Sequence, residues 1–137
     1  MATFQTADEV YKTFGKFLAQ LTQEPDMRPK FVAADTSFLV NYTDPDSRIL
    51  VDCTCDPPRV VTDPPADASA EIKLAMSADD GHKFWLGKLN MTVALAKKQV
   101  KVSGPMAKMM KLLPALKPGF ARYRTYLEQN GYADKVL

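Results

Sequence analysis

Catalytic chemistry would have to be built from few residues in this 137-residue chain. His82 is the only histidine, and its place in the first turn of a predicted helix favours a solvent-facing side chain. Cys53 and Cys55 fall on one face of a predicted strand, a spacing poorly suited to a disulfide, and with a single histidine they fall short of a structural zinc site. Asp79 and Asp80 suit the start of a helix, and no phosphate-binding glycine pattern occurs. The sequence therefore predicts no enzyme, no metal site and no cofactor.

Binding chemistry has a better candidate in the methionine-rich segment that follows Pro105. Apolar side chains recur there at the i, i+3, i+4 and i+7 spacing of a helical stripe, at Met106, Met109, Met110 and Leu113. Pro105 suits the opening position of this helix. Methionine is unbranched and flexible, so such a stripe can form the wall of an adaptable pocket. The spacing alone favours ordinary core and leaves the pocket open as the alternative.

Capping and turn residues mark the elements that must position these methionines. Ser77 is followed at the third position by Asp80, the spacing of a capping box, and Gly87 can end the helix that begins there. Asn90 can cap a second short helix. Residues 99–103 then alternate, which predicts a strand with Val100 and Val102 on one face.

The first half of the chain predicts a helix followed by four strands. Residues 37–43 and 48–54 flank the turn-rich segment 44–47 and should pair as an antiparallel hairpin. Residues 59–61 predict a third strand, and residues 69–76 alternate as a fourth strand with one buried face. The preceding helix has a capping box at Thr6 and Glu9 and apolar residues at helical spacing, namely Val10, Phe14, Phe17, Leu18 and Leu21.

Composition adds limits on location. Apolar residues make up 46% of the chain, but no apolar run approaches the roughly 18 residues that span a bilayer. The N-terminal segment lacks a basic stretch followed by an apolar one, so no secretory signal is predicted. Residues 135–137 also lack the usual peroxisomal tripeptide. We expect a cytoplasmic protein.

The order of the predicted elements and the sequence motifs in residues 77–120 resemble those of the lipid-binding domain of the sterol carrier protein type 2 family. The resemblance lies in the acidic capped helix, GKLN at 87–90, the lysine-rich strand, the glycine turn and MKL at 110–112. Met91 departs from the family, which commonly has proline there, and Lys98 stands where glycine is usual. The resemblance implies an α+β fold: a sheet of about five mainly antiparallel strands, helices over one face and an apolar tunnel between them. It further implies that residues 1–137 form a single, stand-alone, bacterial domain.

The resemblance also implies the function. We expect intracellular binding and transfer of a lipid, such as a fatty acid, acyl-coenzyme A, a phospholipid or a sterol. The alternative is a non-catalytic accessory protein that presents a lipid, such as an isoprenoid quinone precursor, to a partner enzyme. By resemblance, the tunnel residues are Trp85, Met91, Leu95, Val100, Val102, Met106, Met110, Leu113 and Phe120. The sequence leaves open whether the helix predicted from Phe120 onward covers this tunnel or the sheet.

Charge is unevenly distributed along the chain. The first 80 residues carry 7 Lys/Arg against 14 Asp/Glu, whereas residues 81–137 carry 11 against 2. The basic half can contact an anionic membrane surface or headgroup, or it can pair with the acidic half within the fold. No nucleic-acid-binding motif accompanies the charge, so nucleic acid is not expected as a partner. The predicted headgroup contacts are Lys97, Lys98, Lys101, Lys108 and Lys111.

Overall fold

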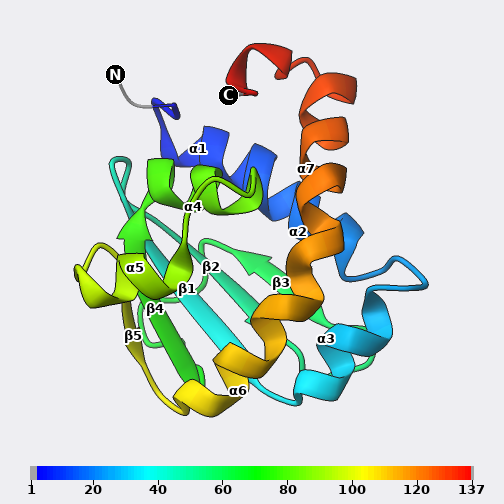
Figure 1. Ribbon diagram of the computed structural model, residues 1–137, viewed down its shortest axis with the longest axis vertical. Helices are drawn as coiled ribbons and strands as arrows, with labels where there is room; N and C mark the ends of the chain where they lie inside the picture. Colours follow the sequence, from blue (N-terminus) through cyan, green and yellow to red (C-terminus); the bar gives the residue numbers. More distant parts are fainter. Residues whose placement is uncertain (1–2, 137) are drawn as a thin grey trace.

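Residues 3–136 are described in this computed structural model, and their strands form one mixed sheet (Figure 1). The predictions for the N-terminal segment, for residues 135–137 and for a domain over residues 1–137 include Met1, Ala2 or Leu137, which lie outside the described residues. Strand β1 is parallel to β4, and the other neighbours are antiparallel. The predicted α+β class and the mainly antiparallel sheet are therefore confirmed. The spatial order is β3 (Arg59–Thr62), β2 (Ser47–Asp52), β1 (Ser37–Thr43), β4 (Ile72–Ser77) and β5 (Lys101–Ser103).

Helices cover one face of this sheet (Figure 1). The first helix is continuous through α1 (Ala7–Val10), the π-helical η1 (Tyr11–Gly15) and α2 (Lys16–Leu21). The remaining helices are α3 (Arg28–Ala34), α4 (Ala78–Trp85), α5 (Met91–Ala96), α6 (Met106–Leu112), the 3₁₀ turn η2 (Leu113–Leu116), α7 (Lys117–Gln129) and the 3₁₀ turn η3 (Ala133–Lys135).

The opposite face of the sheet is crossed by residues 63–71, which connect edge strand β3 to β4. This connection must pass over β2 and β1, because β4 pairs with β1 rather than with β3. Arg48 fastens it by donating from Nη1 to the carbonyl oxygens of Pro64 at 3.3 Å and Pro65 at 3.1 Å. Leu39, which points to this side, is buried.

Predicted helix starts are confirmed by their hydrogen bonds. Thr6 Oγ1 accepts from the Glu9 amide at 3.2 Å, and Ser77 Oγ accepts from the Asp80 amide at 3.0 Å. Asn90 Oδ1 accepts from the Val93 amide at 3.1 Å. The first amide groups of a helix have no carbonyl partner within the helix, and these side chains accept their hydrogen bonds instead. Because each cap lies within three residues of its partner, the local sequence was sufficient to locate the helix starts.

Two local features, at α3 and Pro105, differ from the predictions, and a third concerns the departure from the family noted at Lys98. Helix α3 was not predicted, because Phe31 is its only buried residue and so gives no periodic stripe. Pro105 has φ −70° and ψ 97°, an extended conformation, and therefore precedes α6 instead of opening it. Lys98 has φ +60°, a left-handed conformation that favours glycine, the residue usual at this position in the family that the sequence resembles.

His82 is fully buried, so the prediction of a solvent-facing side chain was wrong. Its Nε2 lies 2.6 Å from the Lys135 carbonyl oxygen and therefore carries the proton that it donates. Its Nδ1 lies 2.7 Å from the Tyr123 hydroxyl and accepts from it. The partners come from α7 and η3, more than 40 residues away, which the pattern within α4 could not indicate.

An aromatic cluster around Phe17 joins three helices above the sheet. The Phe17 ring centroid lies 5.2 Å from that of Trp85 in α4, and 4.9 Å and 5.7 Å from those of Tyr123 and Tyr126 in α7. All four rings are buried, and such pairs add stability beyond the area that they bury. This side of the helical layer is firmly packed.

We predict that acid destabilises the protein partly through His82, because burial lowers the pKa of its imidazole. As pH falls through about 6.5, the unfolded chain takes up a proton before the folded one does, so stability is full above that pH and declines below it. Each unit of pKa depression corresponds to about 1.4 kcal/mol. Chemical denaturation of the parent protein and of His82→Gln across pH 5 to 8 measures how the free energy of unfolding depends on pH. The variant should be less stable but should lack the decline near pH 6, and an unchanged decline in it would exclude His82 as the cause.

Candidate functional site

A cavity of about 110 Å³ lies between the sheet and the helices. Its sheet wall is formed by alternate residues of the three central strands, Phe38, Val40, Tyr42, Val51, Leu74 and Met76. Its helical wall is formed by Leu18, Phe31, Gly81, Phe84, Trp85, Met91, Met109, Leu112, Leu113 and Leu116. The strands supply one residue in two, because successive side chains point to opposite faces.

The wall of this cavity is almost wholly apolar. No charged side chain lines it, and only Tyr42 and Trp85 carry a polar side-chain atom. Burial raises the pKa of the Tyr42 hydroxyl, which therefore stays neutral at physiological pH. Because an unpaired polar group would lose its hydration there, the cavity suits hydrocarbon and excludes charged groups.

The cavity is small for a lipid. An engineered cavity of about 150 Å³ in another protein holds a single benzene molecule, so about 110 Å³ cannot hold a long acyl chain without movement of the wall. The methionines at the helical wall, Met91 in α5 and Met109 in α6, have three rotatable side-chain bonds each and can adapt. A long ligand would therefore have to displace this wall.

The structure brings only some of the predicted tunnel residues to the cavity. Trp85, Met91 and Leu113 line it. Val100 is buried in the core, and three others are partly buried against the core, namely Leu95, Val102 and Phe120. Met106 and Met110 are 42% and 40% exposed, because the side of α6 that faces inward carries Met109 and Leu112. Their part in ligand binding stays a prediction.

Several cavity residues were not among the predicted tunnel residues. The strand residues had a usable signal, since the alternation in residues 37–43, 48–54 and 69–76 marks one apolar face. Phe31 had none, because α3 lacks a periodic stripe. Met109 belonged to the predicted stripe, but spacing could not distinguish it from its exposed neighbour Met110.

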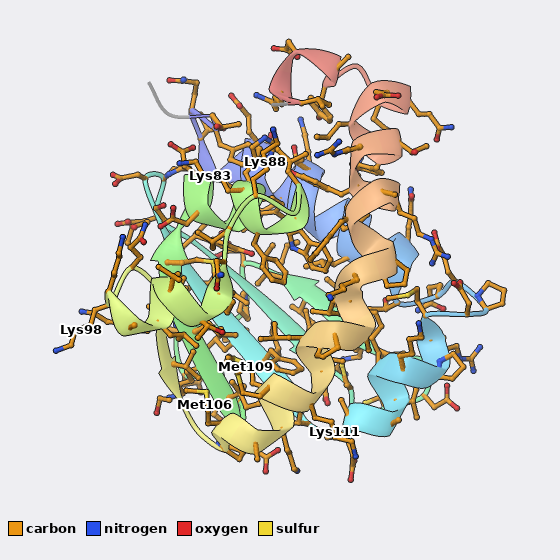
Figure 2. All side chains as sticks on the ribbon, in the orientation of Figure 1. Lys83, Lys88, Lys98, Met106, Met109 and Lys111 are labelled. Atoms are coloured by element: carbon orange, nitrogen blue, oxygen red, sulfur yellow. The ribbon has the colours of Figure 1, made fainter. Side chains whose placement is uncertain are left out.

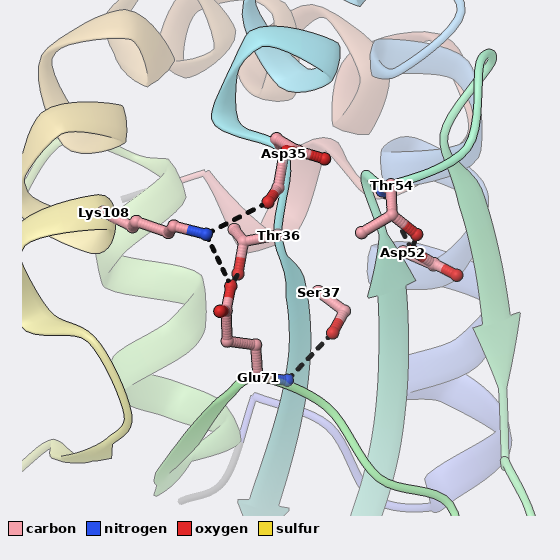
Figure 3. A network of polar contacts seen from close by, with 7 residues as sticks. All are labelled: Asp35, Thr36, Ser37, Asp52, Thr54, Glu71 and Lys108. Carbon is pink, nitrogen blue, oxygen red and sulfur yellow. Dashed lines mark hydrogen bonds and ion pairs between the residues drawn. The ribbon is translucent and has the colours of Figure 1, made fainter.

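Lys108 is held within the fold, as Figure 3 shows. Its Nζ lies 3.0 Å from Glu71 Oε1 and 3.3 Å from the Asp35 carbonyl oxygen. Thr36 donates its hydroxyl to the same Glu71 oxygen, and this bond and Lys108 lower the pKa of the Glu71 carboxyl. Lys108 thereby ties α6 to the start of β1 and to the segment before β4.

The other four predicted headgroup lysines are exposed, but Lys101 does not lie on the helical side of the sheet. Lys101 is the register partner of Ala75, and the neighbouring pair of Leu74 and Val102 points toward the cavity side. Lys101 therefore points to the opposite face of the sheet, away from the helices. Lys97 and Lys98 follow α5, and Lys111 lies on α6 (Figure 2).

Two further searches concern residues 3–136 alone. No group of three or more His, Cys, Asp and Glu side chains is arranged to hold a metal ion there. No helix in that part of the chain combines the length and the apolar content that crossing a membrane requires.

Comparison with known proteins agrees with this architecture. The model of the SCP-2 sterol transfer family matches residues 14–117. No curated protein sequence matches the chain. The sterol carrier protein domain 2 of Helicoverpa armigera is 17% identical with a TM-score of 0.63, over 77% of this chain and 87% of that one. Sterol carrier protein 2 from Yarrowia lipolytica, in its apo form, is 17% identical with a TM-score of 0.57, over 85% and 90%. A UbiJ-SCP2 ubiquinone synthesis protein is 10% identical with a TM-score of 0.58, over 82% and 89%.

We predict that two adjacent methionines of α6 differ sharply in their contribution to stability. Met109 is 3% exposed and lines the cavity, so Met109→Ala should lower the free energy of unfolding by about 2–5 kcal/mol. Met110 is 40% exposed, so Met110→Ala should stay within about 0.5 kcal/mol of the parent protein. Urea unfolding of both variants measures the difference. Equal losses would mean that α6 is rotated from the orientation described.

Proposed function

Because the chain belongs to the SCP-2 sterol transfer family, we propose that it binds an apolar lipid chain in the cavity between sheet and helices and carries it between donors and acceptors. The observation that carries this proposal is the uncharged wall, built from one face of the sheet and from six helical segments. A fatty acyl chain, acyl-coenzyme A, a phospholipid or a sterol-like molecule would supply the hydrocarbon. Any charged headgroup would remain outside the cavity.

Burial of hydrocarbon is a sufficient source of affinity for this role. Each buried methylene contributes about 0.8 kcal/mol, so a long chain contributes on the order of 10 kcal/mol before opposing terms. Association entropy and displacement of the helical wall offset much of this gain. Moderate affinity and weak discrimination between chains follow, and both suit a carrier that must release its ligand.

We also propose that this function involves no catalysis. Both ring nitrogens of His82 are occupied by hydrogen bonds within the core, so the imidazole is not available as a base. Burial raises the pKa of the Cys53 thiol to about 12, which makes it a poor nucleophile. Cys53 and Cys55 are both unbridged, as suits the reducing cytoplasm in which we expect the chain to work as one binding domain.

A second candidate function is presentation of a lipid to a partner enzyme. The observation that favours it is the fold shared with a protein named as a ubiquinone synthesis protein. The same cavity would then hold the prenyl tail of a quinone precursor. Displacement of a bound fluorescent acyl probe by competing ligands distinguishes the two functions. Stronger displacement by prenylated phenols than by fatty acids supports presentation to a partner enzyme, and the reverse order supports a general carrier.

We predict saturable binding of one fluorescent long-chain acyl probe per chain. Val40→Phe should abolish it or weaken it at least tenfold, because Val40 lines the cavity and the larger ring would fill part of the roughly 110 Å³ available. Fluorescence titration of the purified protein measures the affinity and the stoichiometry.

Leu50→Phe is the matched control for this titration. Leu50 lies on β2 next to Val51, which lines the cavity, so Leu50 points to the other face. It is partly buried, as Val40 is. The control should bind the probe as the parent protein does. Equal affinity in Val40→Phe and the parent would exclude the cavity as the binding site.

A further inference from the structure

One long stretch of the chain carries only positive charge. Between residues 81 and 127 there are ten Lys/Arg and no Asp or Glu. This stretch includes α5 and α6, which supply Met91 and Met109 to the helical wall of the cavity. An acidic partner within the fold must therefore come from elsewhere in the chain.

Only some of these cations have such a partner. Lys108 pairs with Glu71, and Arg122 pairs with Glu24 and Asp26. Within residues 3–136, no carboxylate lies within 4.0 Å of the ammonium groups of Lys97, Lys98 and Lys111, and all three side chains are exposed. Their charge is available to an external anion.

Exposed apolar side chains gather on the same two helices. The large apolar side chains that are exposed in residues 3–136 are Val93 in α5 at 43%, Met106 at 42% and Met110 at 40%, both in α6. Met106 and Met110 are one helical turn apart and so lie on one side of α6. Single exposed apolar residues are ordinary, but these three lie on the two helices that supply Met91 and Met109 to the cavity wall, and the unpaired lysines lie on or directly after the same helices.

We propose that this surface, Val93, Lys97, Lys98, Met106, Met110 and Lys111, docks on an anionic membrane. The methionines and Val93 would enter the boundary between headgroups and acyl chains, while the lysines would contact lipid phosphates or carboxylates. Figure 2 shows Met106 and Lys111 on α6 at the lower edge of the molecule, and Lys98 after α5 at its left edge. Docking in this orientation sets the helical wall of the cavity against the bilayer.

A membrane fits these observations better than nucleic acid does. Single strands are bound by aromatic rings that stack on bases, and no aromatic side chain in residues 3–136 is exposed. Flexible apolar side chains beside lysines instead match the layers of a bilayer surface. The purpose of docking rests on the proposed lipid-binding function, since docking would shorten the path of a lipid between bilayer and cavity.

Co-sedimentation with vesicles tests the proposal. The intact chain should bind vesicles of phosphatidylcholine mixed with phosphatidylglycerol, should bind pure phosphatidylcholine at least tenfold more weakly, and should dissociate as salt increases. Lys98→Gln combined with Lys111→Gln should weaken binding about 25-fold, at about fivefold for each lysine. Met106→Gln combined with Met110→Gln should weaken it at least fivefold, which a purely electrostatic attraction would not do.

The matched control removes two positive charges from the opposite face of the sheet. Lys73 and Lys101 are exposed there, on β4 and β5, so Lys73→Gln combined with Lys101→Gln should change vesicle binding less than threefold. An equal loss in both lysine pairs would overturn the proposal, as would failure of the parent protein to bind anionic vesicles. Tighter binding to single-stranded DNA than to vesicles, weakened by the same lysine changes, would overturn it in favour of nucleic acid.

Acyl-probe titration without vesicles separates this proposal from the proposed function. All three double variants alter exposed side chains outside the cavity lining, so they should remain folded by circular dichroism and bind the probe as the parent does. Retained probe binding with lost docking supports both proposals. Docking that persists in Val40→Phe, where the probe no longer binds, would show that the membrane surface acts independently of the cavity.

Discussion

Aromatic packing around Phe17 is the interaction on which the rest of the structure depends. It holds α2, α4 and α7 together above the sheet through Trp85, Tyr123 and Tyr126. At Gly119 of α7, an added Cβ would lie 3.0 Å from the Trp85 ring, so the approach of α7 to α4 leaves little room for a side chain. This firmly packed half allows the other half of the helical layer to remain hollow without loss of the fold.

On the hollow side, α5, α6 and η2 contribute only aliphatic and methionine side chains to the cavity wall. The segments α5 and α6 are short, and Lys108 ties α6 to Glu71 at the surface, where an exposed ion pair contributes little. If a lipid longer than the resting cavity binds as proposed, this side of the helical layer is where we expect the wall to move. The aromatic half meanwhile keeps the sheet wall in position, which gives one small domain both rigidity and an adaptable binding site.

Much of the fold could be predicted from the sequence, but less of the site could. The hairpin around residues 44–47, the strand at β4 and the capped helices followed from alternation, turn residues and local caps, whereas the parallel pairing of β4 with β1 was evident only in the structure. At the site, Trp85, Met91 and Leu113 were predicted tunnel residues that line the cavity, whereas Met106 and Met110 lie at the surface. Helical spacing indicates which side chains lie on the same side of α6. It does not indicate how α6 is rotated against its neighbours, and this rotation decides which side faces the cavity.

The sequence by itself determined where the capped helices begin and which segments form strands, because caps, turns and alternation act between residues only a few positions apart. Tertiary structure alone decided the burial of His82 beneath Tyr123 and Lys135, and the pairing of Lys108 with Glu71. It also decided that Met109 faces the cavity while Met110 faces solvent. Each of these outcomes depends on which distant elements come together, and the cavity itself is the space that their side chains leave unfilled.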